Sequence, residues 1–210
     1  MLLRQCAIAA LVVFAPYVAG DTYDDMLTAV KMSDIPTVEA LLSKGMDVDT
    51  TDPSANSLVM LAAKNGHLDL VQRLLLHKAR LDVRNSYGET ALMLAAAGGA
   101  LPLVRLLVEH GAAINIGGWN PLIYAAWRGH TEIVKYLIAH GADVDAVAPN
   151  GVTALMMAAR GGHLETVKLL LWEVADPNLK TDSGSTALAW AVKAGNTEIA
   201  AALRAAGAKE

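Results

Sequence analysis

The chain has 210 residues, and 54% of them are hydrophobic, which is enough apolar material for a large buried core. Its 17 basic and 21 acidic residues give a formal net charge of −4. Nucleic-acid-binding proteins usually carry a basic face, so nothing in the composition points to a nucleic acid as partner.

Residues 1–20, MLLRQCAIAALVVFAPYVAG, have the layout of a secretory signal peptide. Arg4 precedes an apolar run over residues 6–15, and the small residues Val18 and Gly20 take the last places before Asp21. The alternative is an uncleaved membrane anchor, but the run is short of the ~20 residues that a spanning helix needs. We therefore predict cleavage after Gly20, a periplasmic or secreted protein, and no membrane contact after cleavage.

The remainder of the chain consists of similar segments. TALMLAAAGGALPLVRLLVEHGAAIN at 90–115 is followed by TALMMAARGGHLETVKLLLWEVADPN at 153–178, and further copies start at residues 24, 57, 120 and 186. The copies are therefore 33 residues apart, with one step of 30. A fixed period in this range indicates a stack of identical supersecondary units, so we predict a single repeat domain over residues 21–210.

The copy that starts at Ser57 shows how one unit folds. A short first helix over 57–63 ends in two alanines that allow close helix approach, and Gly66 turns the chain. Apolar residues then recur at helical spacing over 68–76, which predicts a second, antiparallel helix. In most copies a glycine follows, where a left-handed residue ends a helix at low steric cost. A polar loop such as NSYGE at 85–89 leads to the next copy.

Each second helix begins with a proline or, in the other copies, a carboxylate. Proline is tolerated in a first helical turn, and carboxylates are favoured there by the helix dipole. These acids therefore mark helix starts, and we do not interpret them as catalytic. The residues in this column are Pro36, Asp69, Pro102, Glu132, Glu165 and Glu198.

The chain resembles the ankyrin repeat family. The motifs that carry the resemblance are TALMLAA with GAAIN, NPLIYAA with GH and GADVD, and TALMMAA with GGH, and it extends over residues 24–208. It implies an all-α fold, an ankyrin-repeat solenoid of about six helix–turn–helix repeats joined by hairpin loops. It further implies a non-enzymatic protein that binds partner proteins in the concavity of the stack.

Three departures from the family pattern predict local differences. The histidine of the family's first motif is replaced by apolar residues, so apolar packing is expected to take over part of its role; the replacing residues are Met60, Met93, Ile123, Met156 and Ala189. The loop over residues 112–119 is three residues short, which predicts a notch in the row of loop tips with Trp119 at its root. Lys78 and Val174 occupy the helix-ending glycine column, and valine tolerates positive φ poorly, so the Val174 turn is expected to be reshaped or strained.

Six histidines form two columns and raise the alternative of a metal site. Neighbours within a column are one repeat apart, about 8–10 Å, whereas a zinc ion needs ligand atoms about 2 Å away. The spacing therefore disfavours a metal, and the family resemblance implies that these histidines bond local backbone or interact favourably with a helix C-terminus. No phosphate-binding glycine loop or nucleophile–base pair accompanies them. The columns are His67, His130 and His163, and His77, His110 and His140.

The resemblance also implies where a partner binds: at the loop tips and at the two residues before the turn glycine. Trp119, Trp127 and Arg128 belong to the residue types that make interface hot spots, although Trp127 has packing on its neighbours as an alternative role. Trp190 is expected in the core, and Trp172 has no assigned role. The loop-tip set is Arg84, Ser86, Tyr87, Glu89, Trp119, Asn150, Val152, Asp182 and Ser185. The second set is Lys64, Asn65, Trp127, Arg128, Arg160 and Lys193.

Two functional hypotheses follow. The preferred one is an exported, monomeric adaptor without cofactor or metal that binds a protein, as in stress protection or toxin immunity. The alternative is a periplasmic metal- or small-ligand-binding protein that uses the histidine columns. No residue of the sequence selects the biological role within the first hypothesis.

Overall fold

The computed structural model describes residues 21–209, and the predicted signal peptide lies outside these residues. The described residues form twelve helices and no strand beyond an isolated bridge between Thr51 and Ser57. None of these helices is both long and apolar enough to cross a membrane. The predicted all-α architecture is confirmed.

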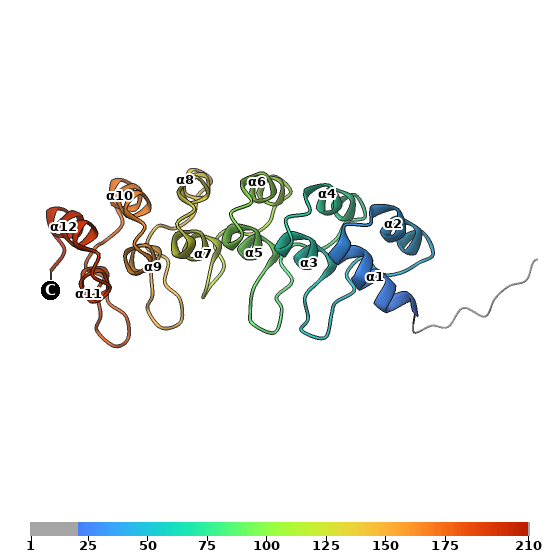
Figure 1. Ribbon diagram of the computed structural model, residues 1–210, viewed down its shortest axis with the longest axis horizontal. Coiled ribbons are helices and arrows are strands. Elements are labelled where there is room, and N and C mark those ends of the chain that lie inside the picture. Colours follow the sequence, from blue (N-terminus) through green and yellow to red (C-terminus); the bar gives the residue numbers. More distant parts are fainter. Residues whose placement is uncertain (1–20, 210) are drawn as a thin grey trace, which may run out of the picture.

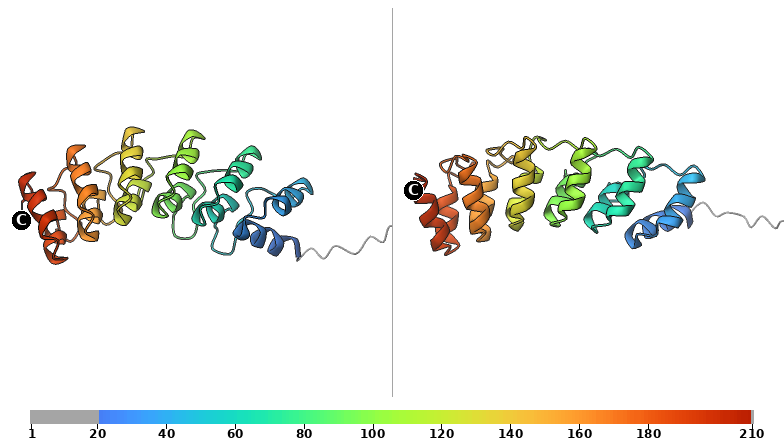
Figure 2. Two further views of the ribbon diagram at one scale, coloured as in Figure 1. Left: turned by 45° about the horizontal axis from the view of Figure 1, so that its top comes forward. Right: turned by 90° about the horizontal axis from the view of Figure 1, so that it is seen from above.

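The helices are arranged as six antiparallel pairs in chain order (Figures 1 and 2). The first helices are α1 (Asp21–Met32), α3 (Leu58–Lys64), α5 (Ala91–Ala97), α7 (Pro121–Arg128), α9 (Ala154–Gly161) and α11 (Ala187–Lys193). The second helices are α2 (Ile35–Ser43), α4 (Leu68–Leu76), α6 (Leu101–Glu109), α8 (Thr131–Ala139), α10 (Leu164–Trp172) and α12 (Thr197–Ala205).

Each odd-numbered helix contacts the next odd-numbered helix, which makes a continuous inner row. Figure 1 shows that the array bends so that the even-numbered helices lie on the convex side and the odd-numbered helices and hairpin loops lie on the concave side. Small residues allow the inner row to pack closely: Ala62, Ala95 and Ala125, for example, have no exposed surface. Each pair buries its apolar stripe against its neighbours, as expected for a solenoid.

Local signals fix where the helices begin. Ser57, Thr90, Asn120, Thr153 and Thr186 each precede a first helix and accept a hydrogen bond from the backbone N–H three residues on. In the second repeat that N–H belongs to Met60, whose sulfur in turn accepts from the Ser57 N–H at 3.4 Å. Met60 is fully buried. The residue that replaces the family's histidine therefore supplies both packing and a weak acceptor.

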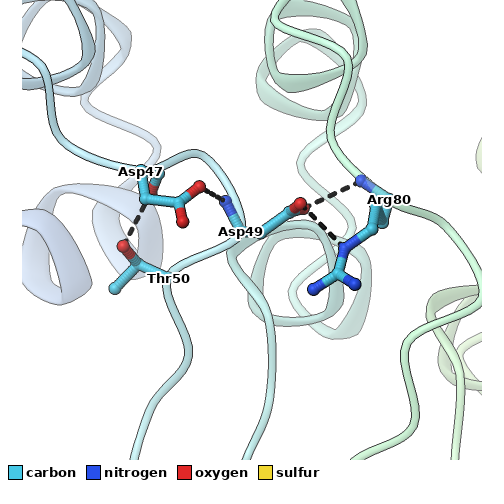
Figure 3. A network of polar contacts seen from close by, with 4 residues as sticks. All are labelled: Asp47, Asp49, Thr50 and Arg80. Carbon is cyan, nitrogen blue, oxygen red and sulfur yellow. Dashed lines mark hydrogen bonds and ion pairs between the residues drawn. The ribbon is translucent and has the colours of Figure 1, made fainter.

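A ladder of hydrogen bonds joins neighbouring repeats at the base of the hairpins. Asp49 accepts hydrogen bonds from the Arg80 backbone N–H and from the Arg80 guanidinium, both at 2.9 Å. The Asp47 carboxylate in turn accepts a hydrogen bond from the Asp49 N–H (Figure 3). The same column bridges every later pair of repeats. The further rungs run from Ala113 to Asp82, Asp143 to Asn115, Asp176 to Asp145 and Lys209 to Asn178.

The second helix of the fifth repeat ends in the left-handed conformation despite having no glycine. Val174 has φ +65°, and its side chain is 83% exposed. A β-branched residue is a steric outlier in this region. Of the two expected outcomes, the structure therefore shows the strained turn and not the reshaped one; Lys78, with φ +62°, takes the same conformation at the end of α4.

Candidate functional site

Several predicted binding residues lie in one row along the concave side, because they occupy equivalent positions at the ends of successive first helices. Lys64, Trp127, Arg128, Arg160 and Lys193 lie at the C-terminal ends of their helices, and all are exposed. Because the three-residue deletion shortens one hairpin, the loop before α7 reaches less far than its neighbours (Figure 1). The predicted notch is therefore present.

Three aromatic rings form a cluster at this notch. Trp119 meets Tyr124 with ring centroids 6.0 Å apart at 62°, and Tyr124 meets Trp127 at 6.4 Å and 65°. Both pairs have the edge-to-face arrangement that aromatic quadrupoles favour. Together with Met157 the rings line an apolar pocket of about 260 Å³. Trp127 remains 44% exposed, so the packing alternative does not account for its whole surface.

Tyr124 was missed by the sequence analysis. Its hydroxyl donates to Glu89 Oε1 at 2.9 Å, and Asn85 Nδ2 donates to Glu89 Oε2 at 2.9 Å. Burial, together with the Glu89 carboxylate, raises the pKa of Tyr124 above its ordinary value. Both carboxylate oxygens of Glu89 thus accept hydrogen bonds within the chain. Glu89, which was predicted to contact a partner protein, therefore positions Tyr124.

The inner column that holds Tyr124 carries a signal that could have revealed it. Leucine occupies this column in the second and third repeats, and Tyr124, Met157 and Trp190 occupy it in the last three. These larger side chains line the floor of the concave face. Trp190, expected in the core, packs against it but is only partly buried and lines a second pocket. The expectation failed because an inner-helix stripe in this fold borders the concavity as well as the core.

The second pocket lies between the last two repeats and carries positive charge. It has a volume of about 520 Å³, and its lining consists of Arg160, Ser183, Ser185, Trp190, Lys193 and Ala194. The Arg160 Cζ lies 5.5 Å from the centroid of the Trp190 ring, and the Arg128 Cζ lies 5.2 Å from that of Trp127. Such cation–π contacts hold a guanidinium over a ring while its N–H groups stay available.

The other predicted site residues lie along the same face or outside it. Arg84 donates to the Gly117 carbonyl at 3.2 Å and so ties its hairpin to the shortened one, while Tyr87 is 78% exposed. Asn65 caps α3 by donating to the Leu61 carbonyl. Val152 is wrong as a loop-tip contact, because its side chain belongs to the hydrophobic core and is only 2% exposed. The remaining loop-tip residues are Ser86, Asn150 and Asp182, all exposed, and the partly exposed Ser185.

Outside the concave face, Trp172 ends α10 on the convex side. It is 83% exposed and lies on the opposite face from the two pockets.

The first histidine column joins repeats to one another. The Nε2 atoms of His67, His130 and His163 lie 2.9–3.1 Å from the carbonyl oxygens of Lys31, Ala97 and Trp127 in the preceding repeat. These bonds cross between repeats instead of staying local. Their acceptors lie in the last turns of α1, α5 and α7, so of the two expected roles this column takes the one at a helix C-terminus. The family pattern places these rings at the helix start, and stacking brings the preceding helix end within their reach.

The second column behaves differently. His110 and His140 bond the backbone four residues earlier, as expected, and His77 pairs with Glu39 at 2.8 Å. Within residues 21–209, no group of three or more histidine, cysteine, aspartate or glutamate side chains is placed to hold a metal ion.

Comparisons with known proteins agree with this architecture. The family model described as "Ankyrin repeats (3 copies)" matches residues 59–148 and 144–209. Human ankyrin repeat and KH domain-containing protein 1 is 51% identical over 45 residues, and rat ankyrin repeat and SAM domain-containing protein 6 is 50% identical over 40 residues. These matches cover 21% and 19% of this chain but only 2% and 4% of the relatives, so they share repeats and not whole-protein organisation.

Solved structures extend the similarity over most of the chain. The human ASB11 ankyrin repeat domain superposes with a TM-score of 0.80 at 25% identity, covering 88% of this chain and 84% of that domain. A chain in the complex of the Bd0816 predatory endopeptidase from Bdellovibrio bacteriovorus with immunity protein Bd3460 gives a TM-score of 0.77 at 29% identity. That match covers 86% of this chain and 97% of the other. From the repeat motifs, the helix pairs and these matches, the chain belongs to the ankyrin repeat family.

Proposed function

We propose that this protein is a non-enzymatic, exported binding protein that recognises a protein partner through the concave face of its last three repeats. Ankyrin repeats mediate protein–protein binding, and the fold is typically a non-enzymatic scaffold. The observation that carries the proposal is Trp127, which is 44% exposed in an apolar pocket beside Arg128. Tryptophan, tyrosine and arginine dominate interface hot spots.

The finer role that we propose is immunity-type protection, in which the protein binds a potentially harmful enzyme. The similarity to a chain in an endopeptidase–immunity protein complex supports this role. The test is a pull-down from periplasmic extract with residues 21–210 as bait, followed by an activity assay of each captured enzyme with and without the bait. Inhibition of a captured enzyme is expected. Captured partners that are all non-enzymes, or enzymes that keep full activity, would contradict the immunity role.

Export is proposed from Arg4, the apolar run over residues 6–15 and the small residues before Asp21. N-terminal sequencing of the protein from its native cells should begin at or near Asp21. An intact Met1 on the mature protein would overturn this part of the proposal.

Replacing Trp127 by Ala tests the binding face. We expect a loss of at least ~2 kcal/mol in partner binding, because the Trp127 indole is the most exposed ring of the aromatic cluster. The loss of folding stability should be much smaller than for Leu170→Ala, since Leu170 is fully buried and such truncations cost ~2–5 kcal/mol. Calorimetric titration with the captured partner and urea unfolding measure the two quantities.

Trp172→Ala is the matched control, because it removes the same type of ring from the convex face, where the ring is 83% exposed against 44% for Trp127. It should leave partner binding unchanged. If Trp172→Ala weakens binding as much as Trp127→Ala, or if Trp127→Ala unfolds the stack as badly as Leu170→Ala while its folded fraction binds normally, the site assignment is wrong.

A further inference from the structure

The larger pocket, between the fifth and sixth repeats, has the composition of an anion site. Arg160 from α9 and Lys193 from α11 supply two exposed positive charges to its lining. Arginine presents a rigid fork of donors that matches a carboxylate, and lysine adds a point charge. Trp190 adds an aromatic ring to the lining, and the Arg160 Cζ lies over this ring, 5.5 Å from its centroid.

The hairpin that lines the pocket adds the hydroxyl groups of Ser183 and Ser185. The Ser183 hydroxyl lies 3.0 Å from Thr181 Oγ1 and 3.5 Å from Ser185 Oγ, and the Ser185 N–H donates to Thr181 Oγ1. These contacts fix the hairpin but leave the direction of each hydroxyl proton free, because either oxygen of each pair can donate. Ser183 and Ser185 can therefore turn a proton toward an anion in the pocket.

The column at the ends of the first helices carries charge opposite in sign to that of the whole chain. The formal net charge is −4, yet the column at the end of the first helices reads Lys31, Lys64, Ala97, Trp127, Arg160 and Lys193. Trp127 is the one aromatic residue among these six positions, and it lines the apolar pocket beside Tyr124. The concave face therefore offers an apolar pocket followed, one repeat later, by a cationic one.

We infer that the pocket lined by Arg160 and Lys193 binds an aspartate or glutamate side chain of the partner, while the neighbouring pocket at Trp127 takes an apolar side chain of the same partner. This inference rests on the proposed protein-binding function and specifies the chemistry of the partner. Neighbouring repeats are about 10 Å apart. That span corresponds to residues three apart in an extended segment, at about 3.3 Å per residue.

The site is testable without the partner. The probe is N-acetylglutamate amide, with N-acetylglutamine amide as an uncharged match, each titrated into isotope-labelled protein (residues 21–210) while the backbone and indole N–H signals are followed by NMR. We expect the glutamate probe to shift the Trp190 indole and the Ser185 and Lys193 amides in a saturable, salt-sensitive manner, because exposed charges are screened by salt. The glutamine probe should not produce these shifts.

Two double variants separate a built pocket from general attraction to positive charge. Arg160→Gln with Lys193→Gln should abolish the glutamate-specific shifts. Lys31→Gln with Lys64→Gln removes the same charge from the same column at the other end of the stack and should leave them intact. Equal shifts from both probes, no shifts at all, or equal losses in both double variants would overturn the inference.

Failure of this inference is distinguishable from failure of the proposed function. If Trp127→Ala abolishes partner binding while the Arg160 and Lys193 double variant binds the partner as the unmodified protein does, the concave binding face stands and the carboxylate pocket is refuted. If the probe binds at Trp190 but Trp127→Ala has no effect on the captured partner, the pocket stands and the proposed binding face is refuted.

Discussion

Introducing histidine at Ala100 should strengthen the stack between the second and third repeats. Ala100 occupies the column whose other members bond the preceding repeat, through His67, His130 and His163 and through Asn196 Nδ2, which donates to the Ala159 carbonyl at 2.8 Å. Its own side chain has no atom that can donate. Its backbone, with φ −83° and ψ 72°, matches that of His67, with φ −79° and ψ 77°.

The structure has room for the new ring. Where a histidine follows, it covers the turn glycine of the preceding repeat: a Cβ at Gly99 would lie 2.6 Å from the His130 ring. At Gly66, the turn that precedes Ala100 by one repeat, a Cβ would meet nothing within 4 Å. By position in the repeat, the expected acceptor is the Lys64 carbonyl. A net hydrogen bond contributes about 1 kcal/mol, which corresponds to a melting-temperature rise of roughly 2–4 °C in a protein of this size.

Urea unfolding and hydrogen exchange of the α3 and α5 amides measure the effect. Hydrogen exchange is needed because repeat arrays can open locally, and a new contact then acts mainly on its own interface. Ala100→Leu is the control, since it adds apolar volume without a donor. The reasoning is refuted if Ala100→His is no more stable than Ala100→Leu, or if the added protection does not lie in α3 and α5.

Two other changes test individual features of the fold. Val174→Gly should raise the free energy of unfolding by about 1 kcal/mol, because it relieves a left-handed β-branched residue whose side chain is exposed; Lys78→Gly should gain less, and an unchanged urea midpoint for Val174→Gly would show that its turn is not strained. Tyr124→Phe should cost about 1 kcal/mol at neutral pH, since it removes a donor from Glu89. Because the folded state raises the pKa of Tyr124, the unfolded chain loses this proton first, so its contribution to stability is complete below about pH 10 and is lost as the pH rises further. Urea unfolding of Tyr124→Phe should therefore show a shallower alkaline decline than the unmodified protein, and identical declines would contradict this assignment.

The sequence by itself determined the repeat architecture, because the signals involved act within a few residues. Apolar spacing predicted the second helix over 68–76, and α4 spans Leu68–Leu76. The residues that begin helices and the glycines that end them operate through local backbone geometry, so each copy could be read alone. The short loop also followed directly from counting residues, and with it the position of Trp119 at the notch.

Only the tertiary structure decided which side chains meet across repeats. Tyr124 and Glu89 are 35 residues apart, and His163 bonds a carbonyl 36 residues earlier. Residues this far apart in the sequence come into contact only when the repeats stack. The same limit explains Trp190, whose position in an apolar stripe predicted burial. A residue in that stripe is buried in the core or borders the concave face, depending on the side chain of the neighbouring repeat and on the curvature of the array. Burial in a solenoid is a property of two adjacent repeats, and the local pattern of one repeat does not contain it.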